Sequence, residues 1–202
     1  MGVVSDVEQK VDEASSGFTI SFENVLQVGF NQFRKAPGVF IIYTVIAGIS
    51  LTNPISGLLL GGPVAAGFYI AAHRLRHDRR VEASDLLMGL NRFVPLFIVT
   101  LLVSLVTMLG FLLLVIPGIY FSVSFLFAHL FVWFYDVPPS EAIRLSRKMV
   151  SGNFPQLLLL WLILGGINLL GSLAFGIGLL LTIPFSFCVI YAAFDDIIGI
   201  PE

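Results

Sequence analysis

Three long stretches of the sequence contain no Lys, Arg, Asp or Glu. They are Pro37–Ala72 (36 residues), Phe93–Tyr135 (43 residues) and Met149–Phe194 (46 residues), and all eleven basic and all thirteen acidic residues lie outside them. A segment this long excludes charge when its surroundings cannot solvate charge, as the interior of a lipid bilayer cannot. Because a spanning helix needs about 20 apolar residues, each stretch is too long for one crossing and suits two.

The composition agrees with a chain that lies in a membrane. Of the 202 residues, 57% are hydrophobic and 12% are charged, whereas a soluble domain carries roughly 25% charged residues. The apolar runs are continuous and do not alternate, which argues against a transmembrane β-barrel. We therefore expect an all-α, polytopic membrane protein with six transmembrane helices, arranged as three hairpins.

The basic residues predict the orientation of these hairpins. Lys and Arg occur in the N-terminal region before the first stretch and in the two long loops that separate the stretches, and none occurs in the short turns inside a stretch. Basic residues in short loops stay on the cytoplasmic side of a membrane. Both termini are therefore expected to be cytoplasmic, in a multi-pass protein of the cytoplasmic membrane.

The hairpins are copies of one unit. The segment Gly57–Pro63 recurs as Gly178–Pro184, and Gly110–Pro117 is a looser copy with one extra residue. Each copy ends in a proline, which frees a carbonyl group and bends a transmembrane helix. The expected helix-bending residues are Pro63, Pro117 and Pro184. After a polar N-terminal tail (1–18), a single transmembrane domain (19–202) is expected, with repeat units at about 19–80, 81–137 and 138–201.

Each unit is expected to begin with an amphipathic cytoplasmic helix that links it to the preceding part of the chain. A serine with a nearby acid is a good start for a helix, because serine caps the first turn and acids suit it. The three pairs are Ser21 with Glu23, Ser84 with Asp85, and Ser140 with Glu141. Such helices lie in the headgroup layer or pack on the ends of the transmembrane helices; the sequence leaves both arrangements open.

No catalytic or metal-binding motif is present, so we expect a non-enzymatic protein without a cofactor. Two polar residues inside the uncharged stretches, His129 and Asn168, are candidates for an intramembrane function, because polar groups there are costly. The alternative is that each is satisfied by a hydrogen bond to a neighbouring helix. The carboxylates of Asp195 and Asp196 are adjacent in sequence and are interpreted as a solvated helix end.

The densest charge cluster lies between the first two hairpins. It contains Arg74, Arg76, Arg79 and Arg80. Arginines beside a membrane attract anionic lipid headgroups, at about 1 kcal/mol each near the surface. The alternative is that these side chains fix the orientation and do nothing more. The run is too short to favour nucleic-acid binding.

Three short motifs follow one another from the second uncharged stretch to the start of the third: Ile116-Pro-Gly118, Glu141-Ala-Ile-Arg-Leu-Ser146 and Asn153-Phe-Pro155. Over roughly Val81–Asp195 the chain resembles small bacterial six-helix membrane proteins of unknown function, and is similar to the membrane domain attached to some glycerophosphodiester phosphodiesterases. The resemblance implies a polytopic module of the bacterial inner membrane. The catalytic domain of those fusions has no counterpart in this sequence.

These observations favour an accessory or scaffolding module that contacts membrane lipids, or a protein partner, through its cytoplasmic face. The first alternative is a transporter or channel for a neutral or lipidic solute, since repeats and proline-broken helices occur in transporters. A cavity lined by His129, Asn168 and Ser122 or Ser124 would support it. The second alternative is a membrane-shaping protein, whose hairpins enter the bilayer without crossing it.

Overall fold

The computed structural model describes residues 2–50, 52–173 and 176–200. These residues fold into helices joined by short connections, and none of them lies in a β-strand, which confirms the all-α prediction. The helices are α1 (Gly2–Ser15), α2 (Phe22–Lys35), α3 (Pro37–Ser50), α4 (Pro54–Arg76), α5 (Ala83–Leu86), the 3₁₀ helix η1 (Met88–Arg92), α6 (Phe93–Leu113), α7 (Val115–Ser124), α8 (Ala128–Tyr135), α9 (Pro139–Ser151), α10 (Phe154–Leu173) and α11 (Leu179–Ile198).

Five segments in the described residues are long and apolar enough to cross a membrane. They are Pro54–Arg76, Met88–Leu113, Val115–Tyr135, Phe154–Leu173 and Leu179–Ile198. The second joins η1 to α6, and the third joins α7 to α8 across a short break. These helices are those of a membrane-embedded protein.

The expected sixth crossing is not confirmed, because α3 has 14 residues. At about 1.5 Å per residue it is about 21 Å long, against about 30 Å for the hydrocarbon core of a bilayer. The first uncharged stretch divides unequally because α4 begins early. The Asn53 side chain caps α4 by accepting a hydrogen bond from the Ile55 N–H at 2.9 Å, and Pro54 occupies the first helical position.

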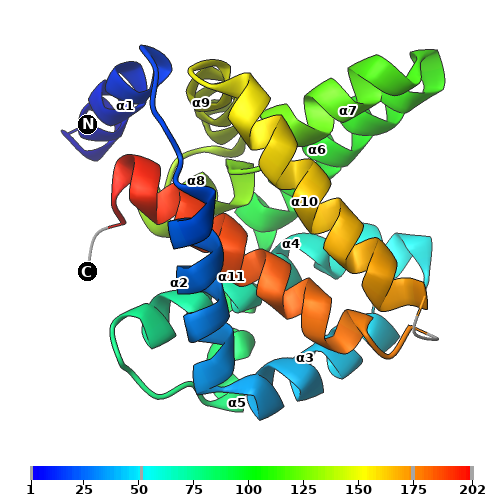
Figure 1. Ribbon diagram of the computed structural model, residues 1–202. Coiled ribbons are helices and arrows are strands. Elements are labelled where there is room, and N and C mark those ends of the chain that lie inside the picture. The colour runs from blue at the N-terminus through cyan, green and yellow to red at the C-terminus, as the bar shows by residue number, and fades with distance from the viewer. Residues whose placement is uncertain (1, 51, 174–175, 201–202) are drawn as a thin grey trace.

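The three hairpins, α3–α4, α6–α8 and α10–α11, extend from one end of the molecule (Figure 1). Helices α1, α2, α5 and α9, with the C-terminal end of α11, lie at that end, which we call the charged end. The opposite ends of the hairpins expose large apolar side chains; Ile49, Ile116 and Leu173 are each more than 70% exposed. Apolar exposure on this scale indicates a surface covered by lipid.

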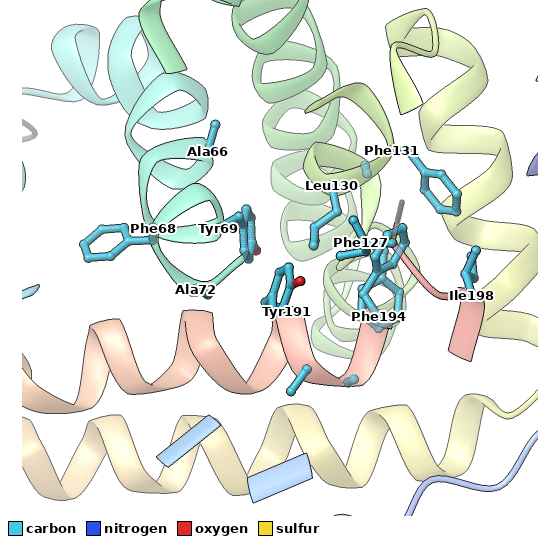
Figure 2. Packing of buried hydrophobic residues seen from close by; sticks show 14 of the residues in the cluster. Ala66, Phe68, Tyr69, Ala72, Phe127, Leu130, Phe131, Tyr191, Phe194 and Ile198 are labelled. Carbon is cyan, nitrogen blue, oxygen red and sulfur yellow. The ribbon is translucent and has the colours of Figure 1, made fainter. Parts of the chain in front are cut away.

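Helix α11 packs in the centre of the core (Figure 2). Its Phe194 packs against Phe127 and Phe131 from the adjoining span, and the Phe131 and Phe194 rings lie edge to face at 5.0 Å. Aromatic pairs of this kind contribute about 0.5–1.5 kcal/mol beyond the area they bury. The core therefore lies near the charged end, where the three hairpins meet.

The three prolines expected to bend helices do not behave alike. Pro63 lies inside α4 and Pro184 lies inside α11, and both are buried. Pro117 instead lies in the first turn of α7. Backbone N–H groups there have no acceptor within the helix, so proline removes no helical hydrogen bond. Pro117 therefore stands at the start of a helix and not inside one. The helix is interrupted further on, between Ser124 and Ala128.

One of the three expected serine caps is confirmed. Ser21 caps α2 and accepts a hydrogen bond from the Asn24 N–H at 3.4 Å. The cap of α5 is Glu82, which forms a reciprocal capping box with Asp85, so Ser84 does not cap this helix. Helix α9 begins at Pro139 without a side-chain cap, so Ser140 does not cap it. Proline replaces the serine there because its fixed backbone suits the first helical position.

Candidate functional site

The linking helices α2 and α9 lie against the hairpins at the charged end. Gly29 of α2 approaches α11 so closely that an added Cβ would lie 2.6 Å from the Val189 Cγ2 atom. Helix α9 turns one face to the bundle, with Ala142, Leu145, Ser146, Met149 and Val150 buried. The second connection differs from the expected amphipathic helix, because it consists of the four-residue α5 followed by η1.

Ion pairs join the elements that meet at the charged end. Asp85 of α5 is buried and lies 2.8 Å from the Arg74 guanidinium at the end of α4. The Asp195 carboxylate of α11 lies 3.4 Å from Arg76. Exposed pairs contribute about 0–1 kcal/mol, whereas a buried partner such as Asp85 depends more strongly on its counter-ion. Much of the charge at this end is therefore structural.

A further pair joins α2 to the loop after α4. The Lys35 ammonium donates to the Asp78 carboxylate at 2.5 Å and to the Leu75 carbonyl at 2.8 Å. The hydrogen bond from Lys35, with its positive charge, holds the pKa of Asp78 below its ordinary value. Asp78 itself has a left-handed backbone with φ of 54°, a conformation that Asp and Asn adopt more readily than most residues.

The polar N-terminal tail forms α1, which packs on α9. Val7 and Val11 are buried in this contact region. Arg144 of α9 is paired with Glu8 of α1 at 2.5 Å and with Glu141 of its own helix. Hydrogen bonds to these two carboxylates raise the pKa of the Arg144 guanidinium. Lys148 forms a second ion pair across the two helices, with Asp12.

The four arginines expected to contact lipid headgroups fall into two classes. Arg74 and Arg76 are engaged by Asp85 and Asp195. Arg79 and Arg80 are exposed, and neither forms an ion pair with any residue that the structure describes. The last two are therefore the arginines of this group whose charge is free to meet a ligand.

Two clefts at the charged end carry basic side chains. The larger one, of about 540 Å³, is lined by Val28, Asn31, Gln32, Arg34, Lys35 and Arg76. The other, of about 320 Å³, is lined by Lys35, Ala36, Leu75, Asp78, Arg79, Arg80 and Val81. In the larger cleft the lining contains no carboxylate, and the buried Gln32 amide has no hydrogen-bond partner among the described residues. Such a lining suits a polar or anionic group.

The structure does not bring the two intramembrane candidates together in one of these clefts. The His129 Nε2 atom lies 3.0 Å from the Thr100 hydroxyl. The Asn168 amide donates to the Ser186 hydroxyl at 2.8 Å and to the Leu164 carbonyl at 2.9 Å. Each is thus bonded to a neighbouring helix, and neither lines the two basic clefts.

Two other titratable side chains at the charged end, Asp195 and His73, also have structural partners. Asp195, besides pairing with Arg76, accepts a hydrogen bond from the Ile200 N–H at 3.0 Å. The His73 Nδ1 atom lies 2.9 Å from the Tyr191 hydroxyl, and the His73 ring lies against the His77 ring. Within the described part of the chain, no three His, Cys, Asp or Glu side chains gather as metal ligands would.

A third cleft, which no sequence pattern predicted, lies beside α9. It has a volume of about 720 Å³ and is lined by Val106, Tyr120, Phe121, Phe125, Ser140, Ile143, Arg144, Arg147, Lys148 and Ser151. Its basic residues follow helical spacing on α9, which is the signal that could have revealed them. The apolar side comes from a different hairpin, so no sequence pattern joins the two sides.

Comparison of the chain with protein-family models, with curated proteins and with solved structures gave no match in any of the three.

Proposed function

We propose that this protein is a non-enzymatic integral membrane module, with an accessory or scaffolding role, that binds anionic lipid headgroups at its charged end. The observation that carries the proposal is the pair of basic clefts between α2 and the end of α4. The exposed side chains of Arg79 and Arg80 add two cations without ion-pair partners among the described residues. Arginines at a membrane surface each contribute about 1 kcal/mol to the attraction of anionic lipids.

The proposed orientation places the charged end in the cytoplasm. Seven of the eleven basic residues lie at or near the ends of α2, α4 and η1: Arg34, Lys35, Arg74, Arg76, Arg79, Arg80 and Arg92. Basic residues in short connections stay cytoplasmic, so both termini would be cytoplasmic too. The resemblance to bacterial modules makes the bacterial inner membrane the proposed location.

In this arrangement α3 completes the first hairpin as a sixth membrane segment. The order of elements supports three related units, because a linking segment, an outgoing helix and a returning helix follow one another three times. A helix as short as α3 needs local thinning of the bilayer or neighbours that shield its ends. The proposed repeat units remain those predicted from the sequence.

The shortness of α3 favours one second candidate, a membrane-shaping protein. With 14 residues, α3 reaches about two thirds of the way across a hydrocarbon core of about 30 Å. A hairpin that enters one leaflet without crossing would leave its turn, at Thr52 and Asn53, inside the membrane. Labelling of a cysteine at Thr52 from outside the cell separates the two functions, because a turn that has crossed the membrane is labelled and a turn inside it is protected.

Headgroup binding is tested by lipid-dependent stabilisation of the purified chain. We expect phosphatidylglycerol to raise the thermal unfolding midpoint in neutral detergent more than phosphatidylcholine does. Replacing Arg79 and Arg80 with Gln should reduce this difference, whereas the matched R79K/R80K variant should keep most of it. Equal stabilisation of the wild-type chain by the two lipids would overturn the proposal.

A further inference from the structure

The cleft beside α9 has two chemically different sides. Its apolar side is formed by Val106 of α6, by Phe121 of α7 and by Phe125, which follows α7. These residues belong to segments long and apolar enough to span the membrane. The opposite side is formed by α9, whose Arg144, Arg147 and Lys148 supply three cations, and the lining includes no carboxylate. A ligand that fits both sides is amphiphilic and negatively charged.

The three cations of the cleft differ in whether they already form ion pairs. Glu8 and Glu141 hold Arg144, and Asp12 holds Lys148. Arg147 is exposed and forms neither an ion pair nor a hydrogen bond with any described residue. An arginine guanidinium offers a planar fork of donors that matches a phosphate group. Arg147 is therefore the side chain of the cleft best placed to receive a phosphate.

Two hydroxyl groups add polar contacts at the rim. The Tyr120 hydroxyl makes no hydrogen bond within the described part of the chain, although its ring packs against Phe121 and Phe154. Ser140, in the first turn of α9, is exposed and likewise has no hydrogen-bond partner among the described residues. Tyrosine with an apolar body and a free polar tip is typical of the membrane–water interface.

We infer that this cleft is a binding site for one anionic phospholipid. The phosphate lies at Arg147, and an acyl chain lies along Phe121 and Val106 towards the hairpin tip. The volume of about 720 Å³ falls within the range of roughly 300–1,000 Å³ that is usual for small-molecule sites. The inference rests on the proposed function and deepens it, since it adds a specific site to a general attraction for headgroups.

The experiment is native mass spectrometry of the full chain in neutral detergent, titrated with phosphatidylglycerol or with phosphatidylcholine of the same acyl chains. The wild type should bind one phosphatidylglycerol more tightly than further copies. Arg147→Gln should weaken this first binding about fivefold, in line with the usual contribution of one arginine. Val106→Trp should fill the apolar side and weaken the first binding of both lipids.

Lys10→Gln is the matched control, because Lys10 is exposed on α1 at the same end of the molecule and lines none of these clefts. It removes an equal charge and should leave the first binding unchanged. If K10Q and R147Q weaken binding equally, the attraction is general and the site is wrong. If R147Q and V106W both leave a wild-type preference for phosphatidylglycerol, the site is wrong while the proposed function stands. If the wild type shows no such preference, the proposed function fails with it. The R147Q result decides even if V106W does not fold, because Arg147 is on the surface.

Discussion

The Ser146 hydroxyl accepts a hydrogen bond from the Phe127 N–H at 3.2 Å, across the interface between α9 and the break that separates α7 from α8. The same hydroxyl donates to the Ser124 carbonyl at 2.9 Å. The break lies inside a segment long enough to span the membrane. Irregular backbone at such a place is tolerated where protein buries it and satisfies its polar groups. One buried side chain on α9 thus replaces part of the missing helical bonding.

Replacing Ser146 with Ala should therefore destabilise the protein. The substitution leaves a buried N–H and a buried carbonyl without this partner, and each such group costs about 1–3 kcal/mol. We expect a loss of at least 1 kcal/mol in the free energy of unfolding, measured in detergent. Ser151→Ala is a suitable control, because Ser151 is an exposed serine at the end of the same helix. Equal stability of S146A and the wild type would contradict this account of the break.

A second prediction concerns two adjacent glycines of α4. A Cβ at Gly62 would collide with the Leu96 carbonyl and the Thr100 hydroxyl of α6, whereas a Cβ at Gly61 would lie 3.6 Å from the nearest neighbour, the Thr100 Cγ2 atom. Gly62→Ala should cost about 1–3 kcal/mol, because the helices must move apart. Gly61→Ala should be neutral or stabilising by up to about 1 kcal/mol, since alanine favours the helix.

Thermal unfolding of the two variants in the same detergent checks this prediction. The order of stability is decisive: G61A should unfold at a higher temperature than G62A. The reverse order would show that α4 and α6 do not pack as closely as their backbones indicate.

The ion pair between Lys35 and Asp78 predicts a dependence on pH. Because the pKa of Asp78 is lower in the folded protein than in the unfolded chain, its stabilising effect is present above the unfolded value of about 3.9. The effect is lost as the pH falls through the folded value. The unfolding midpoint of the wild type should therefore exceed that of Asp78→Asn near pH 6, and the difference should shrink as the pH falls and vanish once Asp78 is protonated in the folded protein.

Asn is the appropriate replacement, because it tolerates the left-handed backbone of residue 78. A difference between the two proteins that stays constant across this pH range would show that the pair contributes nothing through charge.

The sequence predicted the features that depend on composition and short-range chemistry. The uncharged stretches predicted the apolar helices, five of which are long enough to cross a membrane, and Ser21 marks the start of α2 as expected. The length of α3 was misjudged, because the cap at Asn53 and the proline after it divide the first stretch unequally. The predicted caps at Ser84 and Ser140 are wrong, because Glu82 caps α5 and Pro139 occupies the first position of α9.

The interruption between α7 and α8 could not be predicted from local sequence. It depends on Ser146, which lies about twenty residues further along the chain and reaches the break through the packing of α9. The cleft beside α9 was missed for the same reason. Its cations follow a helical pattern that can be read from the sequence, but Phe121 and Val106 reach it through the packing of separate helices.

The central claim is that the uncharged hairpins cross the membrane while the charged end stays in the cytoplasm. It is tested most directly by single cysteines at Thr52, Ser172 and Arg80, all of which are exposed. They are placed in a chain in which the buried Cys188 is replaced by alanine, and intact cells are treated with a membrane-impermeant maleimide.

The account predicts that T52C and S172C are labelled from outside, and that R80C is labelled after the membrane is opened but not before. Labelling of R80C in intact cells would contradict the orientation. Protection of both T52C and S172C would contradict the crossings and would favour hairpins that enter one leaflet without spanning the bilayer.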